Sequence, residues 1–178
     1  MPNQNQIFHA HCACGQTVFE GRGTPMITIA CYCDDCQTAG RQIDQMPNGH
    51  SGLQADGGTL SVLFRKDRVQ CTRGKEHLSD HKLKPSSHTT RVIASCCNSN
   101  MATRFDNWYP MVALRTHSQN VDAVQPQICL CTKFAPDADK IAIQAPRHSG
   151  IAPSFVLKLL TASVQLGFQR IPTDNRVY

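Results

Sequence analysis

Three cysteines at positions 31, 33 and 36 are the residues of this chain best suited to chemistry. They form the run CYCDDC, directly after the apolar segment at residues 26–29. Residues two apart on a strand share a face, so Cys31 and Cys33 can direct their sulfurs to one side, and a turn at residues 34–35 can return Cys36 to them. Zinc takes four ligands, and three protein ligands with one open position are typical of reactive zinc. We call these three cysteines the claw. They predict a zinc site that is either open or closed by a ligand from elsewhere in the chain; the alternative is that the run binds no metal.

Two further cysteine groups accompany the claw. Cys12 and Cys14 form a second pair at a spacing of two, followed by Gly15, which suits a tight turn. Cys96 and Cys97 are adjacent, and neighbours on a regular strand point to opposite faces. Only one of them would then reach a given metal, unless the backbone turns at Asn98, a residue type that tolerates turns. The sequence therefore predicts that Cys12 and Cys14 act together, and leaves open which residue of the 96–97 pair joins them.

The remaining cysteines are interpreted as packing residues. Cys129 and Cys131 are flanked by Ile128 and Leu130, and Cys71 stands alone. Buried free cysteines behave as small hydrophobic residues, and no further pair is available to complete a third site. We therefore expect these three side chains to fill space in the core.

Composition limits the protein to a few broad classes. The chain has 178 residues, of which 40% are hydrophobic and 17% charged, which is enough for one domain with a hydrophobic core and a short appendage. The net charge of +5 is spread out, without a dense basic run, so we expect no nucleic-acid partner. No segment approaches the roughly 18 uncharged apolar residues of a membrane span, so we expect no membrane partner either. The sequence does not indicate an oligomeric state.

Cysteine usage indicates the compartment and the metal. Residues 1–6 lack the basic and apolar regions of a secretory signal, and we expect a cytoplasmic protein. In a reducing compartment, ten cysteines clustered at spacings of one and two residues are more often metal ligands than disulfides. The expected cofactor is Zn²⁺, with one or two ions per chain.

The elements that position these cysteines are mostly strands. Short apolar runs separated by turn residues predict strands at residues 59–64, 68–72, 91–95 and 111–114, in addition to those that flank the first two cysteine groups. Gly40 interrupts residues 37–42, where we predict no helix. The single predicted helix covers about residues 153–167, with Pro near its start and Gly167 at its end, and its apolar spacing predicts packing on the sheet. Together these elements predict a mainly β fold.

The order of the cysteine groups resembles the glutathione-dependent formaldehyde-activating enzyme family, abbreviated GFA and grouped with centromere protein V. The resemblance rests on CACG at residues 12–15, CYCDDCQ at residues 31–37 and the cysteines that follow a long gap, with further similar pieces at residues 55–59, 73–78 and 94–97. These pieces look like an uncharacterised bacterial branch of the family. The resemblance covers about residues 7–115, which we assign to one zinc-binding β domain, with residues 116–178 as a C-terminal extension packed on it.

The resemblance implies a fold, two zinc ions and a set of site residues. The fold would be a β-tent (Mss4-like) arrangement of small antiparallel sheets that meet at the metal sites. Cys31, Cys33 and Cys36 match the family's reactive zinc site and would be the catalytic residues. Cys12 and Cys14 match the first pair of its structural zinc site. The family's later CxxC departs here, because Ala94 stands where its first cysteine would be, so Cys96 and Cys97 are the candidate ligands.

The resemblance also implies a reaction. The chain would be a carbon-sulfur lyase acting on adducts between glutathione-type thiols and small aldehydes, with a small thiol such as glutathione as its partner. Arg41, near the claw, is a candidate to receive a substrate carboxylate. Two alternatives stay open: a non-catalytic binding module stabilised by zinc, and a redox-responsive protein whose thiolates oxidise and release metal.

Overall fold

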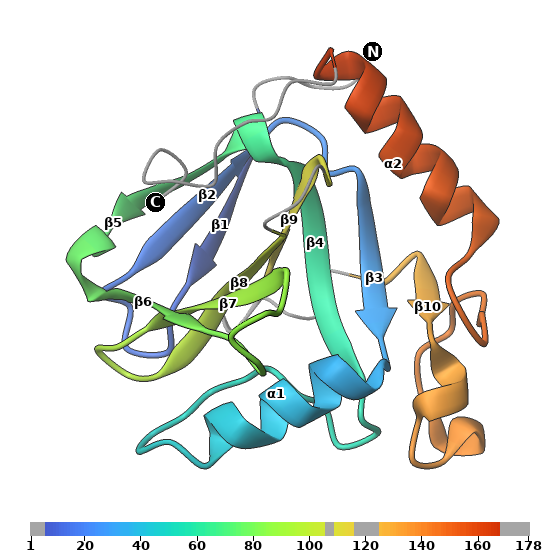
Figure 1. Ribbon diagram of the computed structural model, residues 1–178, viewed down its shortest axis with the longest axis horizontal. Coiled ribbons are helices and arrows are strands. Elements are labelled where there is room, and N and C mark those ends of the chain that lie inside the picture. The colour runs from blue at the N-terminus through green and yellow to red at the C-terminus, as the bar shows by residue number, and fades with distance from the viewer. Residues whose placement is uncertain (1–5, 106–108, 116–124, 168–178) are drawn as a thin grey trace.

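A computed structural model describes residues 6–105, 109–115 and 125–167 of the chain. Two sheets form most of it (Figure 1). The smaller sheet is antiparallel, in the order β1 (Ile7–His11), β2 (Val18–Arg22) and β5 (Val69–Arg73). The mainly β prediction is therefore confirmed for the described residues.

The larger sheet has seven strands, and only one of its pairings is parallel. Its order is β10 (Ile128–Leu130), β3 (Ile27–Cys31), β4 (Thr59–Arg65), β9 (Met111–Leu114), β8 (Ser99–Phe105), β7 (Thr89–Ala94) and β6 (Leu78–His81). The short strand β10 adds to the edge at β3 in the parallel direction, whereas the other neighbours are antiparallel. This late strand brings the residues after position 125 beside the claw.

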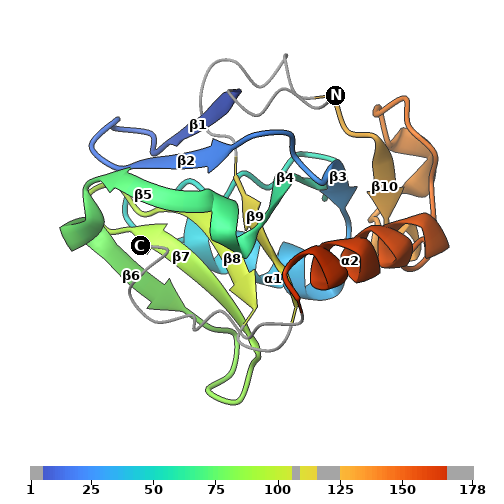
Figure 2. The same cartoon turned by 90° about the horizontal axis from the view of Figure 1, so that it is seen from above.

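Both faces of the larger sheet are covered, and strand alternation explains how. On β4, Val62 and Phe64 point toward the smaller sheet and belong to the core between the sheets, while Leu63 points to the other face. Gly21 of β2 allows the close approach, because a Cβ there would meet the Phe64 ring at 2.5 Å. Figure 2 shows the smaller sheet and helix α2 (Pro153–Gln165) on opposite sides of the larger sheet.

The predicted C-terminal helix is present and packs on the sheet, but with only part of the predicted face. Phe155 and Leu159 are buried in the core on the second face of the sheet, as expected. Val156, Leu160 and Val164 have 43%, 49% and 63% of their surface exposed. Two of the predictions fall partly outside the described residues. They concern residues 1–5, where we expect no secretory signal, and residues 116–124 and 168–178 of the predicted C-terminal extension.

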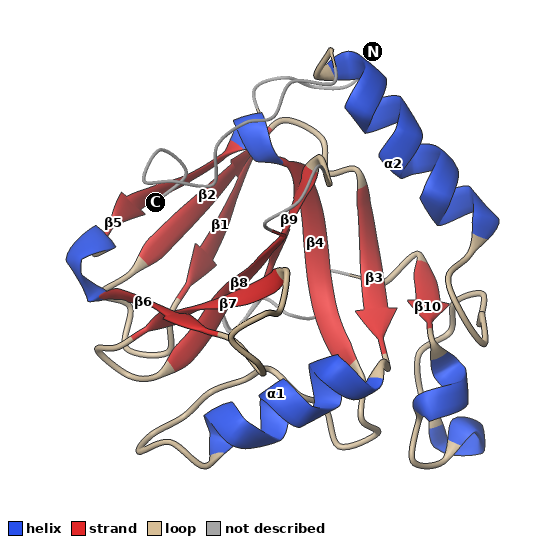
Figure 3. Cartoon of the chain, in the orientation of Figure 1, coloured by secondary structure: helices blue, strands red, loops and turns tan. Residues whose placement is uncertain are grey.

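Helix α1 (Asp34–Asp44) corrects the prediction that residues 37–42 form no helix (Figure 3). Asp34 and Asp35 lie in its first turn, where carboxylates interact favourably with the helix dipole. Gly40, read as a helix breaker, instead lets Leu53 approach, since a Cβ at Gly40 would lie 3.1 Å from Leu53. The cost of a glycine within the helix is thus offset by packing. Short 3₁₀ turns complete the structure at η1 (Lys66–Arg68), η2 (Lys75–His77), η4 (Thr132–Phe134) and η5 (Ala138–Lys140).

Candidate metal centres

Cys12, Cys14, Cys96 and Cys97 converge into one group, which we call the four-cysteine cluster. The four sulfurs all lie within 4.8 Å of one another. The Cys12 and Cys14 sulfurs are 3.5 Å apart, and Cys96 lies 3.8 Å from Cys12 and 3.4 Å from Cys14. Four sulfurs at about 2.3 Å from a tetrahedral zinc would be about 3.8 Å apart, so the cluster fits this ion.

Two turns bring the four sulfurs together. The first joins β1 to β2, where Gly15 has a φ of 76° and donates its N–H to the Cys12 carbonyl. The second joins β7 to β8, where Asn98 has a φ of 49°, in the left-handed region that asparagine tolerates. Because the backbone turns there, both Cys96 and Cys97 reach the group. The turn thus brings both residues of the 96–97 pair to Cys12 and Cys14, so that Cys96 joins the group although Ala94 carries no sulfur.

Neighbouring groups hydrogen-bond the sulfurs of the four-cysteine cluster and favour the thiolate form of Cys97, whereas the pKa of Cys14 is raised and burial raises that of Cys96 to about 12. The backbone N–H of Thr17 donates to the Cys12 sulfur at 3.2 Å, and the Ser99 hydroxyl lies 3.1 Å from the Cys97 sulfur. Against the rise that burial imposes, the bond with Ser99 and the backbone amide of Cys14 lower the pKa of Cys97 to about 6. Cysteine binds zinc as a thiolate, so a pKa below 7 favours zinc binding by Cys97 at neutral pH.

The claw lies at the other end of the larger sheet, near its edge. Cys31 is the last residue of β3, Cys33 is extended, and Cys36 is in the first turn of α1. The N–H of Cys36 donates to the Cys33 carbonyl at 3.0 Å, which folds the chain back. The three sulfurs lie within 4.8 Å of one another, so they fit three corners of a zinc tetrahedron. The start of α1, rather than a separate turn, returns Cys36 to its partners.

The claw concentrates negative charge on Cys36. Hydrogen bonds from Cys31 and Cys33, followed by the charges of Arg115 and Arg91, hold the pKa of Cys36 well below its usual value. The pKa of Cys31 is raised, first because its thiol donates to neighbouring sulfurs. The arrangement thus favours a cation shared between the sulfurs.

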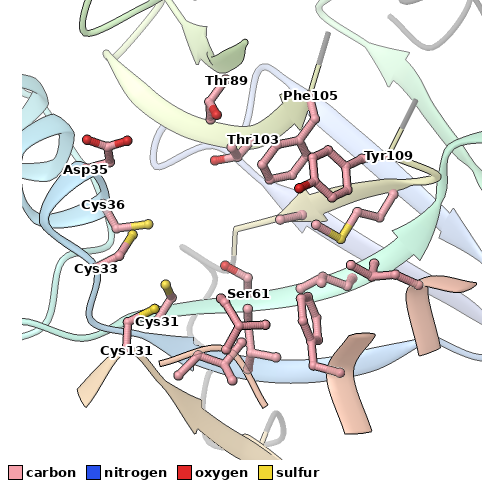
Figure 4. A pocket seen from close by; sticks show the side chains of 18 of the residues that line it. Cys31, Cys33, Asp35, Cys36, Ser61, Thr89, Thr103, Phe105, Tyr109 and Cys131 are labelled. Carbon is pink, nitrogen blue, oxygen red and sulfur yellow. The ribbon is translucent and has the colours of Figure 1, made fainter. Parts of the chain in front are cut away.

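Cys131 is a fourth thiol beside the claw, which the sequence reading assigned to packing. Its side chain contacts that of Cys31, and this bond lowers the pKa of Cys131 to about 7. On β10, Leu130 pairs with Cys31, so regular alternation would turn Cys131 to the opposite face. A φ of 58° at Cys131 reverses that direction. Figure 4 shows its sulfur next to the claw. In contrast, Cys129 is fully buried on the other face among Ala30, Tyr32 and Ile141, as a packing residue would be.

The claw opens on a pocket of about 470 Å³. Figure 4 shows the thiols at one side of this pocket and the rings of Phe105 and Tyr109 across from them. Arg91 and Arg115 line it, whereas Arg41 does not. Arg41 is exposed on α1, and its nearest side-chain partner is Thr38 at 3.5 Å. The arginines that line the pocket thus lie on or beyond strands far along the chain, whereas Arg41, the candidate suggested by its place in the sequence, lies outside it.

Comparison with protein families supports the resemblance. Residues 7–46 match the family model of the glutathione-dependent formaldehyde-activating enzyme. These residues are GFA-like. The matched segment contains Cys12, Cys14 and the whole claw. Cys96 and Cys97 lie beyond it, and the fold brings them to the first pair. A comparison with curated proteins found no match.

Neither of the two α-helices in the described part of the chain could cross a membrane, because neither is long and apolar enough.

Proposed function

We propose that this GFA-like chain binds two zinc ions and acts at the claw as a carbon-sulfur lyase on adducts of glutathione-type thiols with small aldehydes. The observation that carries the proposal is the contrast between the sites. The four-cysteine cluster supplies a complete set of thiols, whereas the claw supplies three thiols at the wall of a pocket. Cys12, Cys14, Cys96 and Cys97 would hold a structural ion, and Cys31, Cys33 and Cys36 the reactive one.

The reaction is an addition and its reverse. The thiol sulfur bonds to the carbonyl carbon, and the thiol proton passes to the carbonyl oxygen; cleavage breaks the carbon-sulfur bond and returns the proton. Zinc, when bound, supplies positive charge that lowers the pKa of a thiol ligand. The chain contributes a site flanked by Arg91 and Arg115, whose positive charges favour the thiolate form of Cys36. Because the proposal requires reduced thiols, it includes a reducing compartment such as the cytoplasm.

A rate measurement tests the proposal. Formaldehyde labelled with ¹³C and glutathione form their adduct spontaneously, and NMR exchange spectra report how fast the two sides interconvert. We expect the zinc-loaded chain to accelerate the exchange, Cys33→Ser to abolish the acceleration and Cys71→Ser to retain it. Cys71 is the matched control because its sulfur belongs to neither group of converging cysteines and donates to the Arg73 carbonyl instead. No acceleration by the wild-type chain would refute the lyase.

One observation favours the alternative of a non-catalytic module stabilised by zinc. Cys131 contacts Cys31, so a small movement of its side chain could close the claw with a fourth thiolate. A site with four thiolate ligands is typical of structural zinc. Against this, the Cys131 sulfur is not among the group whose members all lie within 4.8 Å of one another.

A further inference from the structure

The pocket beside the claw lies on one face of the larger sheet. Strand register places Arg91 opposite Thr103, Thr103 opposite Ala113, and Ala113 opposite Leu63. Residues opposite each other in a ladder share a face, so this row forms the floor. All four line the pocket. The residues of α2 that line it contribute the opposite wall.

The far part of the pocket is apolar. Phe105, Tyr109 and Met111 line it from the sheet side, and Phe155, Val156 and Leu159 from α2. The Phe105 and Tyr109 rings are 5.5 Å apart in a tilted arrangement. A volume of about 470 Å³ lies within the range of about 300–1,000 Å³ that is typical of small-molecule sites. A one-carbon aldehyde would leave most of this apolar surface without contact.

Two buried guanidinium groups lie at the other part of the pocket. Arg91 is 2% exposed and Arg115 is 4% exposed. Arg115 is held by Ser61 and by Thr103, whose hydroxyl is 3.1 Å from Nη2, and Arg91 donates to the Asp35 carbonyl at 3.0 Å. These hydrogen-bond partners are neutral. No carboxylate of the described residues lies within ion-pair distance of either guanidinium, and the Asp35 carboxylate, which lines the same pocket, acts on Arg91 only through its charge. Nη1 of Arg91 and Nε of Arg115 are buried without a hydrogen-bond partner.

Burying two cations this way is costly unless an anion joins them. The Cys36 thiolate and the Asp35 carboxylate supply part of that charge, because both interact with Arg91. They do not use the unpartnered N–H groups. A carboxylate suits such groups, since its two oxygens match the planar arrangement of guanidinium donors.

We propose that this pocket binds a small carboxylate with an apolar chain, with the carboxylate at Arg91 and Arg115 and the chain along the apolar wall beneath α2. The identification of this ligand as the aldehyde-derived part of a thiol adduct rests on the proposed function. The binding of a carboxylate at the two arginines is independent of the proposed function. The pocket would then select larger, amphipathic substrates over formaldehyde.

Calorimetric titration of the reduced, zinc-loaded chain tests this directly. Butanoate, hexanoate and octanoate should bind progressively more tightly, by about fourfold for each added methylene, because each buries more apolar surface. Acetate and octan-1-ol serve as controls for the head group and the chain alone, and each should bind at least about tenfold more weakly than octanoate. Affinity that is independent of chain length, or equal for octanoate and octan-1-ol, would overturn the proposal.

Two matched pairs of variants locate the ligand. Arg91→Met should weaken octanoate binding by about tenfold or more, whereas Arg22→Met, which removes one exposed positive charge from β2, should not change it. Val156→Glu places a negative charge at the pocket and should weaken binding. Leu157→Glu, at a neighbouring exposed position that does not line the pocket, should leave it unchanged. If Arg91→Met fails to fold, the comparison of Val156→Glu with Leu157→Glu decides whether octanoate binds in this pocket.

The outcomes separate this inference from the proposed lyase. Octanoate binding that responds to Val156→Glu, in a chain that does not accelerate adduct exchange, supports the pocket and refutes the lyase. Accelerated exchange without octanoate binding refutes the pocket alone. If Arg91→Met releases zinc from the claw but leaves octanoate affinity unchanged, the arginines serve only the thiolates and the inference is wrong.

Discussion

The four-cysteine cluster and the claw use the same ligand type in different surroundings. The cluster draws two cysteines from each of two turns, and its sulfurs are bound by nearby amide and hydroxyl groups. The claw draws its three cysteines from one continuous run, and it faces a pocket lined by two buried arginines. A cluster that ties together distant segments suits a structural ion, and a local one beside a pocket suits reactivity.

The largest expected difference between the two sites is in stability. Cys97→Ala should remove a ligand that links the β7–β8 turn to the β1–β2 turn. Structural zinc contributes about 10–16 kcal/mol in small zinc-dependent folds, which is comparable to the whole stability of about 5–15 kcal/mol of a domain. We therefore expect Cys97→Ala to be largely unfolded by circular dichroism, and Cys33→Ala to keep its fold while it loses activity. Equal unfolding of the two variants would make both sites structural.

Cys131 offers an intermediate test, because it decides whether the claw is open. On our account Cys131→Ala keeps two zinc ions and retains adduct exchange, as does Cys129→Ala, its neighbour on the other face of the sheet. Competition with a chromogenic chelator measures the retention of zinc. A loss of one zinc ion from Cys131→Ala alone would show a closed site and support the non-catalytic module.

The smallest expected effect concerns the turn that completes the four-cysteine cluster. Asn98 has a φ of 49°, and an alanine in this conformation costs about 1–2 kcal/mol. Asn98→Ala should thus lower the free energy of unfolding by about 1 kcal/mol more than Asn98→Gly, in urea titrations. Both variants lose the bond from the Asn98 side chain to the Pro47 carbonyl, so the comparison isolates the backbone term. Equal effects would mean that the turn conformation does not matter.

Spacing identified the cysteines whose relation is local, the family resemblance linked Cys12 and Cys14 to the 96–97 pair, and neither identified Cys131, whose position is set by the fold. Spacing was sufficient for Cys31, Cys33 and Cys36, because strand alternation and one helical turn define their geometry. Cys131 could not be assigned, since a parallel strand pairing and a left-handed residue bring it to Cys31. The only available signal was its CxC spacing with Cys129, which points to the wrong partner.

The same limit applies to the charged and helical residues. Arg91 and Arg115 reach the pocket from β7 and from just beyond β9, so proximity in sequence favoured Arg41 instead. Gly40 was interpreted as a helix breaker because glycine has a low intrinsic helix propensity. That propensity contains no information about Leu53, which packs against Gly40 in the folded chain. The apolar spacing in α2 predicted a helix correctly, but it could not tell which of its two apolar faces would meet the sheet.

Native mass spectrometry of the freshly purified, reduced chain tests the central claim most directly. The account predicts two zinc ions in the wild-type chain, and one zinc ion in a folded Cys33→Ala variant. On addition of glutathione, the wild-type chain should gain one glutathione, and Cys33→Ala should gain none. A wild-type chain that carries no zinc, or one that binds two zinc ions and never takes up glutathione, would contradict the assignment of the claw as a reactive thiol-binding centre.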